Sequence, residues 1–520
     1  MSRLLIFGLI FGALVVLWQW RSGCYQSDLA ANPDEPAHVV SSLLIRDYVA
    51  DGMPEAPLPF ARNYYVHYPK VAIGHWPPLF HAAEAMWMLV FGRTKAAMLA
   101  MVAVSSVALL VCVFAWVSRR CGTVAGVFAS VVLMLPIFMR EAMDSVEPDI
   151  ALALLAFLAA ASYGRFLETG HRKHVFVFWI LAAASLLTHG RGAAICFLPA
   201  VVALTRRQFR PAWITTLFSV AFVAAATILP NWLGQAYPFS LHDALASVWT
   251  FPLHVIAAIG WPVLIVAFIG CIAILHSAPR RAGWHAMCGL ILSTFLFYIL
   301  VSVPIESRYL ATITPGIAAL FGAGIASVSS FVAARWRLPF AGGALAALAC
   351  GATIPPARVF DRKPDPGFHR MVNAGGAAGI ATRVYLIAGD PQNEGAFIVD
   401  MALADPRRER IVLRASKMLA QSSWIGTGYR LLFNDPRSLA AWLDEAHVAA
   451  VILQTADSRP HVALLRSMME RPDSPWVRVY DVDAPRGIAI FRRAGPMPAG
   501  RPGIRIDMHW AGTEYFELGY

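Results

Sequence analysis

Residues 94–117 read TKAAMLAMVAVSSVALLVCVFAWV, and the basic pair Arg119-Arg120 follows them almost directly. Lys95 is the one charged residue in this stretch, which is long enough for a helix to cross a bilayer, since a crossing takes ~20 apolar residues. Comparable stretches recur through the first two thirds of the chain, whose 520 residues are 58% hydrophobic and only 14% charged. The sequence therefore predicts a polytopic α-helical membrane protein and excludes a soluble domain.

The basic residues are spread over short loops between the apolar stretches. The formal net charge is +11, but a surface that binds nucleic acid gathers its lysines and arginines into one patch or stripe. Basic residues beside membrane helices instead mark the cytoplasmic side. We therefore expect no nucleic-acid partner. Six of the seven cysteines lie in or beside apolar stretches, so we predict no disulfide framework.

The N-terminus, with Arg3, is predicted to stay in the cytoplasm behind an uncleaved first helix. The segment 78–92 is short for a span and carries the polar residues His81 and Glu84 on one face. We interpret it as a helix lying in the membrane interface. That interpretation, unlike a crossing, leaves the later basic clusters in the cytoplasm: Arg119-Arg120, Arg172-Lys173, Arg206-Arg207 with Arg210, Arg280-Arg281, and Arg335 with Arg337.

This topology has eleven crossing helices within residues 1–356, which we predict to form one transmembrane domain. The first outer loop, with juxtamembrane helices, covers residues 21–92, and a later outer loop covers residues 231–254. The segments that contain the acidic residues are all predicted to lie outside. The lipid bilayer itself is therefore one expected partner of the chain.

The C-terminal part of the chain, residues 360–520, is charged and rich in turns. Short apolar runs alternate there with helical patterns, which is typical of a compact α/β domain. The predicted strands are 384–388, 411–413, 449–453, 477–482 and 488–491, and the predicted helices include 438–446 and 462–470. Because the last predicted span ends outside, we expect this domain to be periplasmic or extracellular.

The first acidic segment is Asn32-Pro33-Asp34-Glu35-Pro36. Its two prolines restrict the backbone around Asp34 and Glu35. An acid held in this way can take a proton from an acceptor hydroxyl or amine as a general base, or orient the acceptor. The alternative is that Asp34 caps the helix that begins at Glu35, with Pro36 in its first turn. The spacing leaves both interpretations open.

The second acidic segment is Asp144-Ser145-Val146-Glu147-Pro148-Asp149, at the head of a predicted span. A helix dipole stabilises an acid at this end by ~0.3–1 kcal/mol. A carboxylate beside a bilayer is costly unless it faces water, a cation or a substrate. Glu147 and Asp149 are therefore candidate catalytic acids, and a solvated loop with a helix cap is the alternative.

Five cationic or histidine side chains also fall in the predicted outer loops. Since basic residues are depleted there, they indicate an anionic ligand such as a phosphate group. The candidates are Arg308, His189, Arg191, His75 and Lys70. Arg308 is the strongest because Glu306-Ser307-Arg308-Tyr309 leads directly into a late span, and a simple ion pair with Glu306 is its alternative role.

The sequence has no HExxH motif, CxxC pair or other close spacing of metal ligands. Histidines such as His67, His75 and His81 are more often interfacial or hydrogen-bonded residues than ligands. We predict no metal and no other cofactor, although the sequence does not exclude a divalent ion.

The order of five short motifs resembles the GT-C glycosyltransferases. The motifs are Asp34-Glu35 after the first helix, Pro77-Pro78-Leu79 at the interfacial helix, Glu147-Pro148, Leu187-Thr188-His189-Gly190 between two spans, and Arg308-Tyr309-Leu310. The resemblance covers roughly residues 1–330 and is closest to family 39, which includes protein O-mannosyltransferases and aminoarabinose transferases. It implies an inner-membrane enzyme that takes a sugar from a polyprenyl-phosphate donor.

The resemblance also implies roles for individual residues. Asp34, assisted by Glu35, would be the base that activates a periplasmic acceptor, and Glu147 or Asp149 would be the second acid. Arg308 would bind the donor phosphate and stabilise it as it leaves, with inversion at the anomeric carbon.

This chain departs from its apparent relatives at two phosphate-binding positions. Trp76 stands where they often carry a lysine before Pro-Pro, and His189 stands where they often carry a lysine after Leu-Thr. Phosphate binding would then rely on His75, His189, Arg191 or Lys70.

Two other classes of function remain alternatives at this point. One is a transporter of lipid-linked saccharides, although transporters place polar groups near the bilayer midplane and often contain inverted repeats, which this sequence lacks. The other is a non-catalytic membrane scaffold that presents the C-terminal domain. The sequence names neither the sugar nor the acceptor.

Overall fold

The computed structural model describes residues 2–72, 74–206, 240–275, 282–301, 305–330, 363–373, 383–421, 428–482, 487–496, 503–508 and 513–517. These residues form two compact units. The helical unit comprises Met1–Ser22, Gly74–Phe80 and Leu99–Asp361. The α/β unit comprises Gly23–Ile73, His81–Met98 and Arg362–Tyr520. Residues 23–73 therefore pack with the C-terminal residues as one unit.

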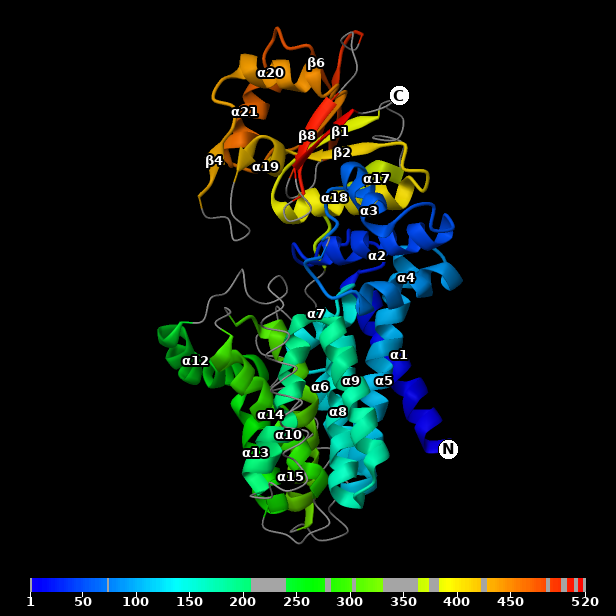
Figure 1. Cartoon of the computed structure of the whole chain (residues 1–520), viewed down its shortest axis with the longest axis vertical. Helices are drawn as coiled ribbons and strands as arrows, with labels where there is room; N and C mark the ends of the chain where they lie inside the picture. Colours follow the sequence, from blue (N-terminus) through cyan, green and yellow to red (C-terminus); the bar gives the residue numbers. More distant parts are fainter. Residues whose placement is uncertain are drawn as a thin grey trace. The chain divides into compact units, whose positions relative to one another are not determined.

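The helical unit is built from long apolar helices (Figure 1). Their bounds are α1 (Ser2–Ser22), α5 (Lys95–Cys121), α6 (Thr123–Leu133), α7 (Ile137–Asp144), α8 (Asp149–Thr169), α9 (Arg172–Thr188), η1 (Gly190–Phe197), α10 (Leu198–Arg206), α12 (Leu241–Ile259), α13 (Trp261–Leu275), α14 (Ala282–Leu300), η3 (Ser307–Thr312) and α15 (Thr314–Ser330).

Four helices of the described residues are long and apolar enough to cross a membrane: Arg3–Ser22, Lys95–Cys121, Asp149–Thr169 and Ala282–Leu300. The number rises to six if each of two bent pairs is one span, namely α6 with α7, bent by 77°, and α12 with α13, bent by 110°. The chain is thus a multi-pass membrane protein. The predicted number of eleven spans stays a prediction, because residues 207–239 and 331–362 lie outside the described part of the chain.

The helices of this unit pack closely where small residues meet. A Cβ atom on Gly164 of α8 would lie 2.9 Å from the Cα atom of Gly283 in α14. A Cβ atom on Gly324 of α15 would lie 2.0 Å from the carbonyl oxygen of Val266 in α13. Small residues let helix backbones approach in this way, and the added van der Waals contact holds helices together in lipid.

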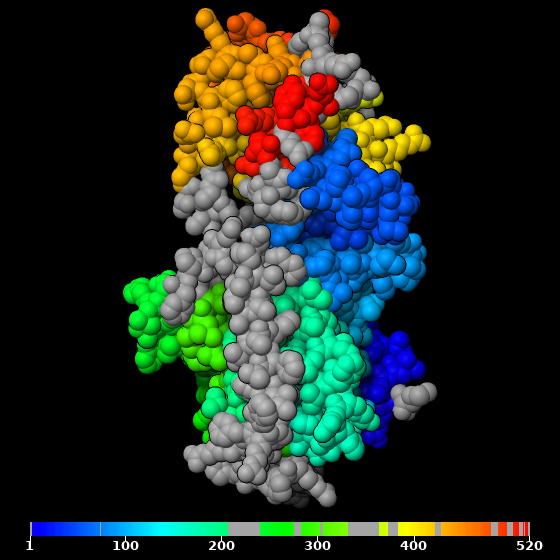
Figure 2. Space-filling view, viewed as in Figure 1, coloured from blue at the N-terminus to red at the C-terminus, as the bar shows by residue number. Residues whose placement is uncertain are grey.

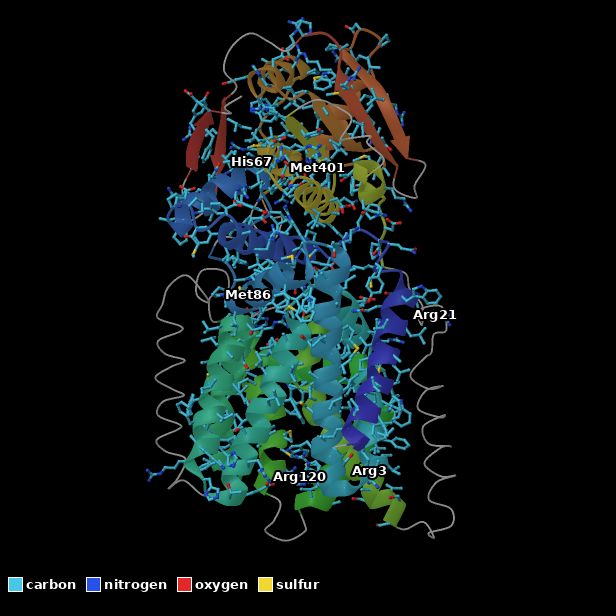
Figure 3. The ribbon with its side chains drawn as sticks, turned by 90° about the vertical axis from the view of Figure 1, so that its right-hand side faces the viewer. Arg3, Arg21, His67, Met86, Arg120 and Met401 are labelled. Carbon is cyan, nitrogen blue, oxygen red and sulfur yellow. The ribbon has the colours of Figure 1, made fainter. Side chains whose placement is uncertain are left out.

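Basic residues mark one end of the helical unit. α1 and α5 run antiparallel, since Gly8 faces Val111 and Gly12 faces Val107. In Figure 3, Arg3 and Arg120 lie at the same end of the helical unit, and Arg21 lies at the other end of α1. This arrangement agrees with the predicted placement of the N-terminus and Arg119-Arg120 on one side of the membrane.

The α/β unit combines the first loop with the C-terminal sheet. The first loop forms α2 (Glu35–Ala50), α3 (Pro57–His67) and most of α4 (Leu79–Phe91). The C-terminal part forms α17 (Phe368–Asn373), β1 (Val384–Ala388), α18 (Pro391–Ala404), β2 (Ile411–Arg414), α19 (Ala415–Met418), β3 (Ala420–Gln421), β4 (Arg430–Leu431), α20 (Pro436–Glu445), β5 (Ala450–Gln454), α21 (Pro460–Met469), β6 (Trp476–Val482), β7 (Ile488–Arg493), β8 (Gly503–Asp507) and β9 (Thr513–Glu517).

Five strands form one mixed sheet in the order β2-β1-β5-β7-β6. β1 pairs in parallel with both β2 and β5, whereas β7 is antiparallel to β5 and β6. Every residue of β1 and β5 is buried, which is typical of central strands covered on both faces. The β8–β9 hairpin lies at the surface of this unit, next to residues of the first loop (Figure 2).

The observed elements agree with most of the expected ones. The helix expected to begin at Glu35 is α2, and the segment 78–92 forms the 13-residue α4. Residues 241–254 of the outer loop expected at 231–254 form most of α12, and their side of the membrane stays a prediction. Ser240 starts this helix by accepting a hydrogen bond from the backbone N–H of Asp243, a cap that the loop assignment overlooked.

Candidate functional site

Glu147 and Asp149 lie where the chain turns from α7 into α8. Pro148 occupies the N-cap of α8, so Asp149 is the first residue of the helix. Both carboxylates are buried, with 5% and 2% of their surface exposed. Burying a carboxylate is costly unless it is paired with a cation or hydrogen-bonded. We therefore identify the partners of Glu147 and Asp149 first.

Arg308 is the partner of Glu147. Its Nη1 lies 3.1 Å from a Glu147 carboxylate oxygen, and its Nε donates to Glu306 at 2.7 Å. Arg308 lies in the short 3-10 helix η3, directly before α15. The ion pair with Glu306, which was the alternative role for Arg308, is therefore present, and the same guanidinium also binds Glu147 of the second acidic segment.

Arg191 is the partner of Asp149, and its Nη2 lies 2.7 Å from the carboxylate. It belongs to η1, which begins after the break at His189, and the His189 ring Nδ1 accepts hydrogen bonds from the Arg191 backbone N–H and Nε. His189 therefore orients Arg191.

The ring of Tyr309 completes this group. The guanidinium carbon of Arg191 lies 4.4 Å from the ring centroid, and that of Arg308 lies 5.5 Å from it. Both distances fall in the range of cation–π contacts. The structure thus brings five of the predicted residues together in the helical unit: Glu147, Asp149, His189, Arg191 and Arg308. We call these five residues and Tyr309 the arginine cluster.

The two arginines of the arginine cluster could bind an anion, and in this structure their guanidinium groups bind carboxylates of the protein itself. Arginine presents a planar fork of donors that suits phosphate as well as carboxylate. An incoming phosphate would take the place of Glu306, which is far more exposed than Glu147, at the partly exposed Arg308.

Asp34 occupies the N-cap position of α2 but makes no capping hydrogen bond with its side chain. Asn32 instead binds the start of the helix, since its Oδ1 accepts hydrogen bonds from the backbone N–H groups of Asp34 at 2.8 Å and Glu35 at 3.2 Å. Asp34 is half-buried, whereas Glu35 is fully buried. The capping alternative for Asp34 therefore lacks the expected contact, and its role as a base stays a prediction.

Glu35 is bound to a residue far along the chain. Its Oε1 lies 2.5 Å from the ammonium of Lys363, and its Oε2 accepts a hydrogen bond from the backbone N–H of Ala31 at 2.7 Å. Lys363 was not predicted, and no local signal identifies it, because it follows the last apolar stretch without a motif.

Lys70 and His75 occupy different environments from the arginine cluster. Lys70, in the α/β unit, donates from its Nζ to the carbonyl oxygen of Pro391 at 3.4 Å. Burial and the nearby cations Arg414 and Lys417 lower the pKa of Lys70 to about 7, against the opposing effect of Asp34 and Glu394. His75, in the helical unit, is exposed and contacts the ring of Trp76.

Helix α4 carries two buried polar residues. The imidazole nitrogens His38 Nδ1 and His81 Nε2 lie 2.9 Å apart, so His81 is hydrogen-bonded, as expected. Glu84 is fully buried, and neither of its carboxylate oxygens has a hydrogen-bond partner among the described residues. Burial raises the pKa of Glu84 to about 8, so this residue is largely neutral at neutral pH.

One group in the described part of the chain has the spacing of a metal site. Ligand atoms of Asp28, Asp365 and His369 lie within 4.8 Å of one another. The Asp28 carboxylate, however, already accepts hydrogen bonds from three backbone N–H groups and from the His369 ring. Its oxygens are thus engaged, and the absence of a required metal stays a prediction.

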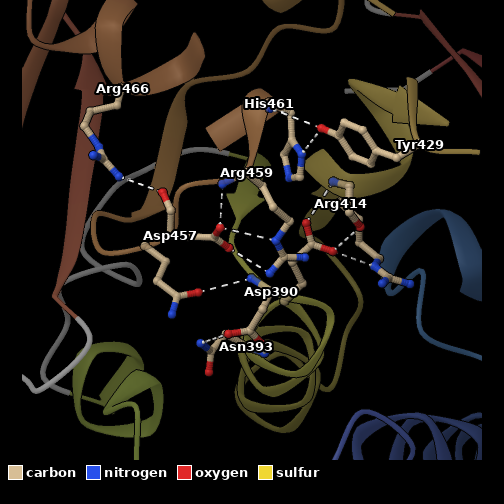
Figure 4. Close-up of polar contacts among 11 residues, drawn as sticks. Asp390, Asn393, Arg414, Tyr429, Asp457, Arg459, His461 and Arg466 are labelled. Atoms are coloured by element: carbon tan, nitrogen blue, oxygen red, sulfur yellow. Dashed lines mark hydrogen bonds and ion pairs between the residues drawn. The ribbon is translucent and has the colours of Figure 1, made fainter. Parts of the chain in front are cut away.

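A polar network lies at the carboxyl ends of β1 and β5 (Figure 4). Asp390 follows β1 and caps α18 by accepting a hydrogen bond from the backbone N–H of Asn393 at 2.8 Å. Asp457 follows β5 and pairs with Arg459 at 2.7 Å. His461 Nδ1 lies 2.8 Å from the Tyr429 hydroxyl oxygen. These contacts join the loops at one edge of the sheet, and sequence reasoning did not identify them.

The fold and the arginine cluster define a class: a multi-pass membrane protein with a polar site at helix ends and an additional α/β unit. Two solved structures with a similar fold illustrate this class. ArnT from Cupriavidus metallidurans, solved bound to undecaprenyl phosphate, has 15% sequence identity and a TM-score of 0.51, and the match covers 94% of this chain and 99% of ArnT.

A second neighbour is the oligosaccharyltransferase from Archaeoglobus fulgidus, solved in complex with Zn and sulfate. It has 14% identity and a TM-score of 0.53, and the match covers 94% of this chain and 73% of that protein. No protein-family model and no curated protein matches the sequence. The chain therefore has the GT-C fold of these neighbours, and the narrower resemblance to family 39 stays a prediction.

Proposed function

We propose that this protein is a membrane glycosyltransferase that moves a sugar from a polyprenyl-phosphate donor to a periplasmic acceptor. The arginine cluster carries the proposal, because two arginines held at helix ends by carboxylates are suited to receive a phosphate. The undecaprenyl phosphate bound to ArnT supports a polyprenyl-phosphate donor for a chain of the same fold. We also propose that residues 1–330 belong to a family 39-like enzyme and that the protein lies in the inner membrane.

The proposed reaction is a single displacement. The acceptor hydroxyl or amine attacks the anomeric carbon while Asp34 takes its proton. The bond between the anomeric carbon and the phosphate oxygen breaks, and polyprenyl phosphate leaves with the electron pair, which inverts the configuration. Arg308 stabilises the charge on the departing phosphate, and Arg191 contacts the same Tyr309 ring. Glu147 and Asp149 hold the two arginines in place.

The proposal is tested with a labelled polyprenyl-phosphate sugar and the purified protein. We expect Asp34→Asn to reduce transfer by about 100-fold or more, since general-base catalysis contributes ~10²–10⁴-fold, and to leave expression unchanged. The matched control is Asp473→Asn, which alters an exposed aspartate in the α/β unit and should transfer normally. Full activity of Asp34→Asn would remove the base assignment. Movement of the donor across vesicles without transfer would favour a carrier instead.

A further inference from the structure

A buried ion pair ties the Asp34 segment to the C-terminal part of the α/β unit. The side chains of Glu35 and Lys363 are 0% and 2% exposed, and their charged atoms lie 2.5 Å apart. Burying two opposite charges is tolerated when they are paired, whereas removing one leaves an uncompensated charge that destabilises the site strongly. The conformation of the segment therefore depends on Lys363, 328 residues away in sequence.

The same C-terminal segment holds the first loop at a second point. The carboxylate of Asp28 accepts hydrogen bonds from the backbone N–H groups of Gly367 at 2.8 Å, Phe368 at 2.9 Å and His369 at 2.9 Å. The ring Nδ1 of His369 lies 2.7 Å from the same carboxylate. Residues 28–35 are thus fixed from both ends by residues 363–369.

Helix α18 supports the segment from a third direction. A Cβ atom on Gly395 would lie only 2.8 Å from the Cβ atom of Pro36, so the glycine allows close approach beside the Asp34 segment. The side-chain amide of Gln392 also donates a hydrogen bond to the carbonyl oxygen of Ala30. The backbone on both sides of Asp34 is therefore held by C-terminal residues.

Asp34 differs from its neighbour in this arrangement. Glu35 is fully buried against Lys363, while Asp34 is half-buried and its backbone N–H is held by Asn32. Two adjacent acids thus have different surroundings: one is fixed inside the α/β unit and the other remains partly accessible.

We propose that Lys363 is a positioning residue for Asp34, and that Glu35 is the anchor through which it acts rather than a second base. The inference rests on the proposed function, because it assigns the C-terminal domain a part in orienting the reacting acid. Loss of the Lys363 ammonium would remove the ion pair of the buried Glu35 carboxylate, and the Asp34 segment would shift. A misplacement of ~1 Å is enough to cost about 100-fold in rate.

The experiment measures kcat and the donor KM for a set of variants. We expect Lys363→Met to lower kcat by about 100-fold with a nearly unchanged donor KM, since the donor site is left alone. Lys363→Arg keeps the charge and should retain most of the activity. Arg370→Met is the matched control, because Arg370 forms an exposed ion pair with Asp365 in the same segment, and it should behave as the wild type.

The double variant Glu35→Gln with Lys363→Met tests whether Glu35 acts as an anchor or as a second base. It removes both charges together, so we expect kcat to recover by about tenfold or more over Lys363→Met alone. An inactive double variant beside a folded, active Lys363→Arg would show that the Glu35 carboxylate itself is needed, which overturns the inference. The inference is equally overturned if Lys363→Met matches Arg370→Met.

Three further outcomes are treated separately. If Lys363→Met does not fold, the double variant and Lys363→Arg still give the comparison, because neither leaves a buried unpaired charge. If the wild type transfers no sugar, the proposed function fails. If the wild type transfers sugar and Lys363→Met does too at the full rate, the positioning role alone fails.

Discussion

Arg308 is the residue that we propose to bind the phosphate of the donor. Its guanidinium binds Glu147 at 3.1 Å and Glu306 at 2.7 Å, so its charge is shared between two carboxylates. A phosphate would replace one of them without leaving Arg308 unpaired at any stage. Lysine presents a point charge rather than a planar fork and cannot hold two groups in fixed directions. The identity of this residue as arginine should therefore matter as much as its charge.

We predict that Arg308→Gln lowers kcat/KM by about 100- to 1,000-fold, the usual cost of removing one group that stabilises a developing negative charge. Arg308→Lys should recover only part of this loss. The measurement is transfer from the labelled donor. Arg165→Gln is the control, since Arg165 is an exposed arginine near the far end of α8. Equal rates for Arg308→Gln and Arg165→Gln would exclude Arg308 from the donor site.

Lys70 gives a prediction about pH. Burial lowers its pKa to about 7, so the ammonium loses its proton as the pH rises through 7. If Lys70 helps to bind an anionic substrate, that substrate's KM should rise between pH 6 and pH 8. Lys70→Arg stays charged throughout this range and should flatten the profile. An identical pH dependence of KM in both proteins would remove Lys70 from substrate binding.

Helix α18 contributes Asp400 to a buried pair of acids in the α/β unit. Asp400 on this helix interacts with the carboxylate of Asp28 in the first loop, and the Lys95 ammonium lies 3.5 Å from its Oδ1. Burial and the Asp28 charge raise the pKa of Asp400 well above its ordinary value, while hydrogen bonds lower the pKa of Asp28. Asp28 therefore ionises before Asp400, which keeps its proton to a higher pH than an ordinary aspartate does.

The effect of this pair on stability has a definite sign. The folded protein keeps the Asp400 proton at pH values where the unfolded chain has lost it, so the contribution of Asp400 falls as the pH rises above about 4. Asparagine at this position cannot ionise and can still donate to Asp28. We predict that the melting temperature of Asp400→Asn, relative to the wild type, increases between pH 5 and pH 9. A constant difference would contradict the raised pKa of Asp400.

At this scale the sequence predicted the regular elements well. The strand expected at residues 384–388 is β1 with the same bounds, and the strand expected at 449–453 is β5, shifted by one residue. Central parallel strands are apolar on both faces and stand out as short runs of valine, isoleucine and leucine. α12 was missed because its amphipathic pattern, interrupted by Pro252, resembles neither a span nor a loop.

The partners of the site residues could not be predicted in the same way. Glu147 and Arg308 are 161 residues apart, and Glu35 and Lys363 are 328 apart. Periodicity and capping are local signals, whereas these pairs depend on how distant elements pack. Sequence reasoning therefore found most members of the arginine cluster but not the ion pairs that organise it.

The helical unit as a whole has two chemically different ends. Asp149 and its partner Arg191 lie at the start of α8, and Glu168, which pairs with Arg120 at 2.9 Å, lies near the end of the helix. A 21-residue helix is ~30 Å long, about the thickness of the hydrocarbon core. The arginine cluster thus belongs to the end opposite Arg120. Positive residues favour the cytoplasm, so the cluster is expected to face the periplasm.

This topology leads to a prediction about labelling. Single cysteines at two exposed positions should react with a membrane-impermeant maleimide in intact cells: Pro33, in the first acidic segment, and Glu141, in α7 just before the second. Both acidic segments are expected outside. A cysteine at the exposed His171, in the turn before α9, should react only after lysis. The seven natural cysteines are first replaced by serine to remove the background. Labelling of Pro33→Cys and Glu141→Cys from opposite sides would be incompatible with one reaction that uses both acidic segments, and it would overturn the proposed transferase mechanism.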